Sequence, residues 1–410
     1  MRTLTMRRAG IVFFVAVFLL SSGTLPAGDW PQFRGPTGQG ISEDTGLPIQ
    51  WSESENVSWK VAIPGTGWSS PVIKDGQLWL TTATEEGRSL RAIRVDIESG
   101  KIVHNVEVFR EEKPAKKHEK NSHATPTPIL EGGRVYVHFG PQGTAALSDA
   151  GEILWKNREL SYVPGHGQGG TPVLAGDLLV INCDGTDKQF VVALDKATGK
   201  IRWSTPRRDA AMAFSTPLVI EQGSTRQVVS PGANRAVAYQ LETGEELWSV
   251  SYNGFSNVPR PVFAHGLVYV ASGFYNPMFY AVRPDGHGDV TKSHVAWTTS
   301  RGVPLTSSPL VVGDEIYFVS DNGIASCLDA KTGRQHWRSR LSGAYAASPL
   351  YAGGHIYFQS ESGLTTVITP GKTFNAVAAN QLDGRTFASP SPAGKAIFLR
   401  TETHLYRIEN

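Results

Sequence analysis

Cysteine and long amphipathic helical runs are both scarce in this chain of 410 residues. The lack of extended helical periodicity, together with 43 Gly, 25 Pro and 40% apolar residues, favours an all-β protein rich in turns. The only two cysteines, Cys183 and Cys327, each lie in an apolar stretch of a different repeat unit, as described below. We expect two small buried side chains. A disulfide stays open as an alternative if the protein is exported.

The chain also lacks an excess of either charge. It has 39 Lys and Arg against 37 Asp and Glu, and loss of residues 1–27 would leave 36 bases against 37 acids. A nearly neutral body offers no electrostatic basis for binding a polyanion. We therefore expect no nucleic-acid partner.

Residues 1–27 resemble a cleavable export signal. Three arginines (Arg2, Arg7 and Arg8) precede the apolar run 11–20, and small or polar residues follow. Ten apolar residues are too few to span a bilayer, which takes about 20. Retention as an N-terminal anchor remains the alternative. We expect an exported protein, periplasmic or secreted, that reaches membranes only through its partners.

The segment 306–337 contains the pattern that most of the chain repeats, TSSPLVVGDEIYFVSDNGIASCLDAKTGRQHW. Short apolar runs alternate with Gly-Asp, Asn-Gly and Asp-Ala-Lys-Thr-Gly turns, which predicts four antiparallel strands. A single meander of this kind cannot bury both of its faces. It therefore requires similar neighbours.

Two residue types mark the period of the repeat. The proline that opens each unit recurs at intervals of 57, 44, 45, 44, 48, 40 and 41 residues, at Pro71, Pro128, Pro172, Pro217, Pro261, Pro309, Pro349 and Pro390. A tryptophan that closes the fourth strand precedes the next proline by 12 to 17 residues, at Trp155, Trp203, Trp248, Trp297 and Trp337. A period of about 40–45 residues is typical of a four-stranded propeller blade. Eight prolines predict eight blades.

The two ends of the chain predict how the ring closes. After Pro390 only 20 residues remain, enough for three strands but not four, whereas Trp59 lies 12 residues before Pro71. We expect residues 56–63 to supply the outer strand of the last blade, which leaves no exposed sheet edge at the seam. The predicted organisation is a signal (1–27), an N-terminal extension (28–55) and an eight-bladed propeller (56–410).

These repeats resemble a known family. The Ser-x-Pro start, the Gly-x-(Ile/Val)-Tyr second strand and the sequence ALDKATGKIRW at 193–203 are similar to the pyrroloquinoline-quinone-type (PQQ-type) propeller repeat. Length and export resemble its outer-membrane-assembly members, the BamB type, and DWPQFRGP at 29–36 resembles the start of many exported propellers. The resemblance covers about residues 29–410 and implies the fold more strongly than an activity.

Long connections predict the working face of the propeller. Loops between the second and third strands, and from each fourth strand to the next blade, leave on one face and include the longest connections. Six cationic or imidazole side chains on these loops are candidates for holding a polar or anionic ligand in a central funnel: His123, His166, Arg208, Arg235, Arg260 and Arg385. The alternative is that they cap strand ends around a water-filled channel. Trp68 and Phe214 precede inner strands and are weaker axial candidates.

Other motifs predict no site. GHGQGG at 165–170 fits a dinucleotide-binding glycine pattern but no helix follows it. His118 and His123 would stand about 140° apart on a helix and could not share a metal. DGHGD at 285–289 has His where a calcium loop needs a second oxygen ligand, and Ala296 stands in place of the distal carboxylate.

The resemblance leaves two functions open. Its dehydrogenases hold PQQ beneath adjacent cysteines and a calcium ion bound by acidic and amide residues, and this chain has no adjacent cysteines. We therefore expect a monomeric, non-catalytic scaffold with no cofactor or metal, binding protein partners or ligands in the cell envelope, in outer membrane protein assembly if it is BamB-like. The alternative is a PQQ- and calcium-dependent, or other metal-dependent, oxidoreductase.

Overall fold

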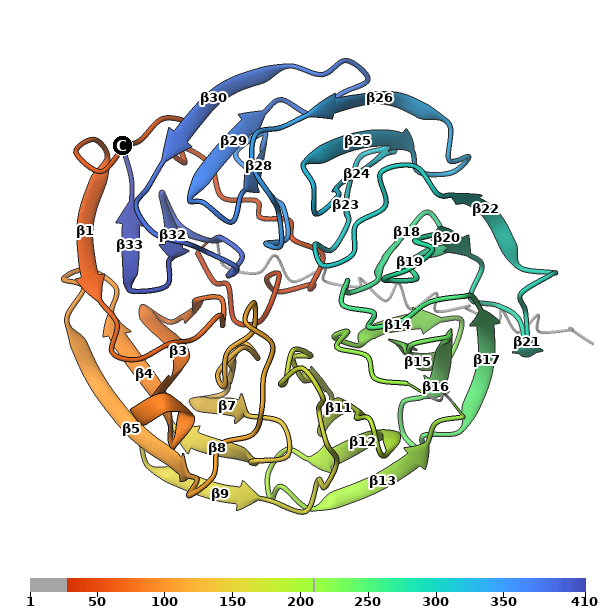
Figure 1. Ribbon diagram of the computed structural model, residues 1–410, viewed down its shortest axis with the longest axis horizontal. Helices are drawn as coiled ribbons and strands as arrows, with labels where there is room; N and C mark the ends of the chain where they lie inside the picture. Colours follow the sequence, from red (N-terminus) through yellow and green to blue (C-terminus); the bar gives the residue numbers. More distant parts are fainter. Residues whose placement is uncertain (1–27, 209–210) are drawn as a thin grey trace, which may run out of the picture.

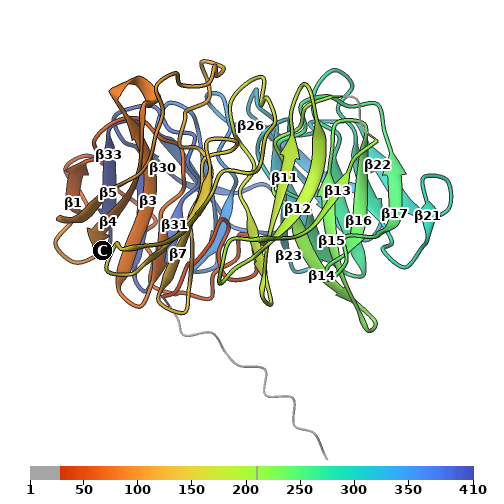
Figure 2. The ribbon, with the colours of Figure 1, turned by 90° about the horizontal axis from the view of Figure 1, so that it is seen from below.

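The computed structural model describes residues 28–208 and 211–410 of the chain. The predicted export signal, 1–27, lies outside the described residues. Eight antiparallel sheets stand around a central axis (Figure 1), and the ring forms a thick disc when viewed from its edge (Figure 2). The prediction of an all-β, eight-bladed propeller is confirmed. The one helix in the described ranges is the short 3-10 turn η1 (Glu85–Gly87).

Blades one to four follow one another along the chain, each running from an inner to an outer strand. Their strands are β2 (Val72–Lys74), β3 (Gln77–Thr84), β4 (Ser89–Asp96) and β5 (Ile102–Arg110); β6 (Ile129–Glu131), β7 (Arg134–His138), β8 (Thr144–Ser148) and β9 (Ile153–Asn157); β10 (Val173–Ala175), β11 (Leu178–Asp184), β12 (Gln189–Asp195) and β13 (Ile201–Pro206); and β14 (Leu218–Gln222), β15 (Thr225–Pro231), β16 (Arg235–Gln240) and β17 (Glu246–Ser251).

Blades five to eight continue in the same order. Their strands are β18 (Val262–Ala264), β19 (Leu267–Ala271), β20 (Phe279–Val282) and β22 (Val295–Thr299); β23 (Leu310–Val312), β24 (Glu315–Val319), β25 (Ile324–Asp329) and β26 (Gln335–Arg340); β27 (Leu350–Ala352), β28 (His355–Gln359), β29 (Leu364–Ile368) and β30 (Ala376–Gln381); and β31 (Ser391–Ala393), β32 (Ala396–Arg400), β33 (His404–Ile408) and β1 (Val57–Ala62).

Strand pairing between the two ends of the chain closes the ring. The eighth sheet has the order β1-β33-β32-β31, so its outer strand comes from the N-terminal side. Trp59 lies opposite Arg407 and Ala62 opposite His404. The predicted closure by the N-terminal strand is therefore confirmed.

Tryptophans of several outer strands bind their blade to the next one. The indole N–H of Trp155 donates to the Lys196 carbonyl at 3.1 Å, and that of Trp297 donates to the Ala330 carbonyl at 2.9 Å. The indole of Trp297 also packs directly on Gly333, in the turn of the next blade. A Cβ on Gly333 would lie only 2.6 Å from this indole. That glycine has φ of 72°, which side chains disfavour as well. The Thr-Gly turn and the Trp thus recur together for a steric reason.

The loop at 283–294 is the exception to this regular packing. Its two-residue strand β21 (Gly288–Asp289) pairs in parallel with β17 of the preceding blade and adds a fifth strand to that sheet. The insertion covers an outer edge that the other blades leave uncovered.

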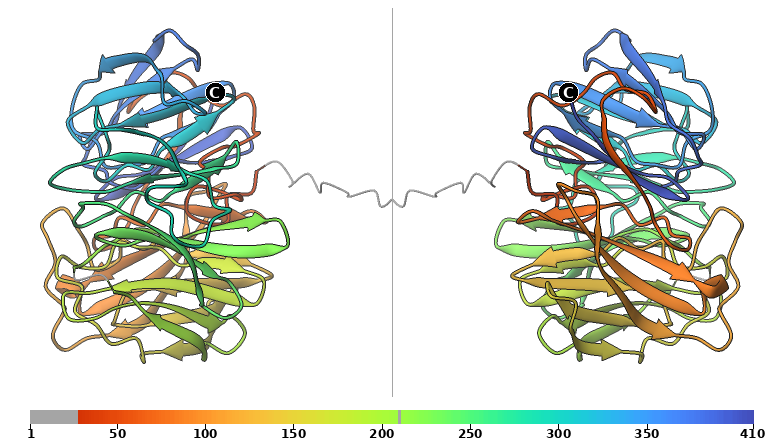
Figure 3. Two further views of the ribbon diagram at one scale, coloured as in Figure 1. Left: turned by 90° about the vertical axis from the view of Figure 1, so that its right-hand side faces the viewer. Right: turned by 90° about the vertical axis from the view of Figure 1, so that its left-hand side faces the viewer.

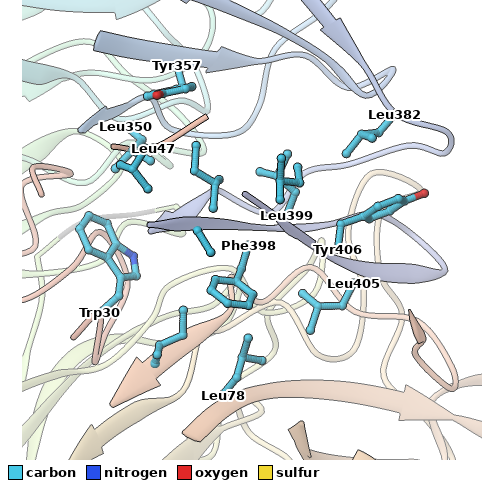
Figure 4. Close-up of a cluster of buried hydrophobic side chains, with 14 of the residues drawn as sticks. Trp30, Leu47, Leu78, Leu350, Tyr357, Leu382, Phe398, Leu399, Leu405 and Tyr406 are labelled. Carbon is cyan, nitrogen blue, oxygen red and sulfur yellow. The ribbon is translucent and has the colours of Figure 1, made fainter. Parts of the chain in front are cut away.

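The N-terminal extension crosses one end of the axis. Trp30 forms a β-bridge with Ile73 in blade one, and Gly40 accepts a backbone hydrogen bond from Tyr351 in blade seven. The first described residues, in red, lie on one face of the disc (Figure 3). Trp30 and Leu47 of the extension join a core cluster with blades seven, eight and one (Figure 4). Trp51 belongs to the same cluster. Burial of such large side chains contributes about 1.5–3 kcal/mol each.

Both cysteines are free and buried, Cys183 among apolar residues of blades two and three and Cys327 among those of blades six and seven. Across residues 28–208 and 211–410, no helix combines the length and apolar character that crossing a bilayer requires.

Candidate functional site

A cavity of about 450 Å³ lies on the propeller axis, at the end opposite the N-terminal extension. Apart from Phe33, every lining residue comes from a loop that enters an inner strand or joins the second and third strands. All eight blades contribute. The size is within the range of about 300–1,000 Å³ that is usual for ligand pockets.

A ring of hydrogen bonds lines the base of this pocket. In seven blades the residue before the marker proline is Ser or Thr, and its hydroxyl accepts the backbone N–H of the equivalent residue in the preceding blade. The bonds, 2.9–3.0 Å long, join Ser70 to Thr127, Thr127 to Thr171, Thr171 to Thr216, Arg260 to Ser308, Ser308 to Ser348, Ser348 to Ser389 and Ser389 to Ser70. The ring is interrupted only where Arg260 replaces the hydroxyl residue. These bonds fix the pocket floor.

Aromatic rings from several blades line the pocket wall. Trp68 packs edge-on against Phe387 with 4.7 Å between ring centroids, and His166 stacks on Phe214 at 6.0 Å with planes 13° apart. Burial, and then the nearby His118, lowers the pKa of His166, which favours the neutral ring. The wall is therefore largely apolar and suits flat or cationic groups.

A strained aromatic pair stands at the pocket mouth. Phe255 and Tyr275 stack with centroids 5.2 Å apart, on loops joined by a hydrogen bond from Phe274 N to Phe255 O. Tyr275 has φ of 76° and its side chain is 79% exposed. A large non-glycine residue in this conformation is strained, and such residues cluster at functional sites.

Two carboxylates line the neighbouring part of the pocket, in blades six and seven. Asp321, between β24 and β25, accepts hydrogen bonds from the backbone N–H groups of Leu305 and Thr306 and from the Thr306 hydroxyl. Burial raises the pKa of its carboxyl above the ordinary value. Glu361, between β28 and β29, forms an ion pair of 2.9 Å with Lys120. The pocket thus combines aromatic walls with a small acidic region.

Of the six predicted ligand-binding residues, the structure brings only His166 to the pocket wall. His123 hydrogen-bonds through Nε2 with the Ala115 carbonyl, and Arg235 forms an ion pair with Glu246. Arg208 is exposed. Arg385 lies over the Phe387 ring, 5.3 Å from its centroid, and is outside the pocket lining. Ligand binding by these residues stays a prediction.

Arg260 faces away from the open pocket and contacts the N-terminal extension. Its Nη1 donates to the Phe33 carbonyl at 2.9 Å, and a Cβ on Gly38 would lie 2.2 Å from it. Arg34 of the extension donates to the carbonyls of Ser308 and Pro309 in blade six. Burial lowers the pKa of Arg34 to about 9 and that of Arg260 to about 10. Arg260 therefore holds the extension in place.

The site does not match the set that the family's dehydrogenases use for PQQ and calcium. Within the described parts of the chain, no three His, Cys, Asp or Glu side chains are placed to share a metal ion. Asp321 already accepts three hydrogen bonds and Glu361 is paired with Lys120. The two cysteines lie in separate clusters rather than side by side.

Sequence analysis missed most of the pocket residues. Trp68 and Phe214, the weaker axial candidates, both line the pocket. Asp321 and Glu361 follow a serine in equivalent turns, SDNG at 320–323 and SESG at 360–363. Alignment of the repeats on these turns is the signal that could have found them.

Comparisons with known proteins point to one family. A sequence profile described as outer membrane protein assembly factor BamB matches residues 41–157, 141–286 and 287–401. A protein of Bordetella pertussis named outer membrane protein assembly factor BamB is 27% identical over 230 residues, which is 53% of this chain. The alignment spans 55%, about half, of that relative.

Solved structures share the fold at low identity. BamB from Moraxella catarrhalis matches with a TM-score of 0.58 and 11% identity, covering 86% of this chain and 99% of that one. A europium-containing methanol dehydrogenase matches with 0.68 and 11%, covering 92% and 90%. A quinohemoprotein alcohol dehydrogenase from Comamonas testosteroni matches with 0.64 and 10%, covering 93% and 80%. Similarity at this identity establishes the fold and no activity.

Proposed function

The chain belongs to the outer membrane protein assembly factor BamB family, and we propose the following function on that basis. The protein is an exported, non-catalytic propeller that binds protein partners in the cell envelope, as part of outer membrane protein assembly. It does so through the open end of its axis. The observation that carries this proposal is the aromatic pocket, which is built by loops of all eight blades on one face.

The form of the pocket supports protein binding. Its mouth presents the exposed ring of Tyr275 beside Phe255, and aromatic residues are enriched where proteins bind one another. An extended segment of a partner can lie across the mouth and insert side chains between the rings. The hydroxyl ring and the packed blades hold the pocket rigid, so binding loses little conformational entropy in this protein.

Affinity capture from an envelope fraction tests the proposal. The tagged protein is expected to recover components of the outer membrane assembly machinery, and the double variant W68A/F214A is expected to lose them. A matched control is Val103→Ser on the outer strand β5, where the side chain is 47% exposed and far from the axis. Equal recovery by the pocket variant, or recovery of no assembly component, would overturn the proposal.

A PQQ-dependent oxidoreductase is the second candidate, favoured by the fold shared with the two dehydrogenases. The donor set of the pocket does not support it. Addition of PQQ and calcium to the purified protein is expected to change neither the absorbance of the quinone nor the melting temperature. A spectral change with a calcium-dependent rise in melting temperature would favour the enzyme instead.

A further inference from the structure

The ion pair between Lys120 and Glu361 joins opposite sides of the pocket. Lys120 belongs to the loop between blades one and two, whereas Glu361 is in a turn of blade seven, and both line the cavity. Their Nζ and Oε1 atoms are 2.9 Å apart. The loop of Lys120 is fixed near this position because His118 N and Asn121 Nδ2 both donate to the His166 carbonyl, at 3.0 and 2.9 Å. A lysine of the protein itself therefore occupies the acidic side of the pocket.

The neighbouring carboxylate adds to the preference for a cation here. Asp321 lines the same cavity, and the positive charge of Lys120 acts on its carboxylate. With two acids and one lysine, the pocket holds one net negative charge when both carboxyls are ionised. Aromatic rings, whose faces attract cations, line other parts of the same wall.

We propose that the pocket is a binding site for the basic side chain, Arg or Lys, of an extended partner segment. In the free protein, Lys120 pairs with Glu361, the carboxylate that would bind this side chain. The identity of the occupant as a partner segment rests on the proposed function. The cation preference rests on the pocket alone. Lys120 can give way because its side chain is 49% exposed, whereas Glu361 is only 15% exposed and stays in the wall.

A competition of this kind has a defined energetic consequence. An arriving guanidinium must displace the Lys120 ammonium, so the internal ion pair lowers the apparent affinity for the ligand. Partly exposed ion pairs contribute modestly and are screened by salt. Removal of the lysine charge should therefore strengthen ligand binding by a few-fold rather than by orders of magnitude.

Calorimetric titration of the purified chain tests the site directly. The probe is a blocked Gly-Gly-Arg-Gly-Gly peptide, with the neutral citrulline peptide as its isosteric counterpart. We expect the arginine peptide to bind at least tenfold more tightly than the citrulline peptide. Lys120→Met is expected to strengthen binding of the arginine peptide about fivefold, and Glu361→Gln to abolish it. Lys116→Met, in the same exposed loop, is the matched control and should change nothing.

The outcomes separate this proposal from the proposed function. Equal binding of the two peptides, or Lys120→Met and Lys120→Gln variants that melt normally and bind no more tightly, would overturn the cation site. Envelope capture that persists in Glu361→Gln would leave the scaffold function standing without this site. Tight peptide binding without envelope capture would leave the site standing and overturn the scaffold function.

Discussion

The two ends of the propeller axis differ in what their side chains do. At one end the N-terminal extension crosses the inner strands, and its Arg34 and the facing Arg260 donate only to backbone carbonyls in buried surroundings. At the other end, loops of all eight blades surround an open cavity with aromatic walls and an exposed Tyr275 at its mouth. The first end is sealed and structural, and the second is accessible and suited to recognition.

This difference separates stability from binding within one ring. Residues of the sealed end are held by long-range contacts, such as the bond from Arg260 to Phe33, 227 positions away. Residues of the open end are held by a regular ring of hydrogen bonds between equivalent residues of successive blades. Changes at the sealed end should therefore cost stability, and changes at the open end should cost binding.

The largest expected effect follows removal of residues 29–51. The deletion uncovers apolar side chains of blades one, seven and eight, and removes the buried rings of Trp30 and Trp51. Loss of about three large buried side chains costs roughly 5 kcal/mol or more, which should lower the melting temperature of a chain of this length by about 6 °C or more. Thermal unfolding followed by circular dichroism measures it. An unchanged melting temperature would contradict the structural role of the sealed end.

A smaller loss is expected from Gly38→Ala. Gly38 has φ of 68°, and an added Cβ would lie 2.2 Å from the guanidinium of Arg260. Gly266→Ala is a matched control because Gly266 has φ of 70° and nothing within 4 Å of an added Cβ. We expect Gly38→Ala to cost about 2 kcal/mol more than the control, since only it adds overpacking to backbone strain. Equal costs in denaturant unfolding would show that this end is loosely packed.

A substitution at the open end should reduce binding and leave stability nearly unchanged. Tyr275→Asn replaces an exposed ring with a residue that tolerates positive φ, so stability should stay within about 0.5 kcal/mol. Envelope capture should fall sharply because the aromatic pair with Phe255 is lost. The two measurements together sharpen the contrast. Full capture by this variant would remove the pocket mouth from the binding surface.

The smallest expected effect is on the pH dependence of folding stability, which has opposite signs at the two faces of the propeller. Hydrogen bonds from Thr198 and Thr332 lower the pKa values of Asp195 and Asp329 in the strand-three to strand-four turns. The stability that these carboxylates contribute is present above their ordinary pKa, about 3.9, and is lost as pH falls toward the folded value. Burial raises the pKa of Asp321, so its contribution has the opposite sign and is lost as pH rises through the folded value.

Melting temperatures measured from pH 5 to pH 2 check these signs. The double variant T198V/T332V should be less stable at pH 5 and should lose less stability as the pH falls to 2, because the folded and unfolded pKa values of the turn carboxylates are then closer together. Superimposable pH profiles would contradict the role of the threonine hydroxyls.

Much of the fold could be predicted because each marker residue has one repeated steric task. The Trp of several outer strands packs on a glycine of the next blade, as Trp297 does on Gly333, so the two recur at a fixed spacing. Closure followed from counting strands at the two ends. The course of the extension could not be predicted, because its contacts with blades one, five, six and seven have no local signal.

The site was harder to predict for a related reason. The chemistry of the cationic residues predicts ligand binding, but two of them make contacts within the protein. Arg260 donates to the Phe33 carbonyl of the extension, and Arg235 forms an ion pair with Glu246. The acids that do line the pocket, Asp321 and Glu361, lie in tight turns whose sequences are also explained by turn formation alone. Only the ring geometry shows that Glu361, in a turn of blade seven, meets Lys120 from the loop between blades one and two.

Hydrogen–deuterium exchange of the protein, alone and with its captured envelope partner, tests the central claim that the open end is the recognition surface. The account predicts slower exchange on binding in the pocket loops 111–126 and 272–278, with no change in the extension at 29–51. Protection confined to the extension or to the outer strands, with the pocket loops unchanged, would contradict it.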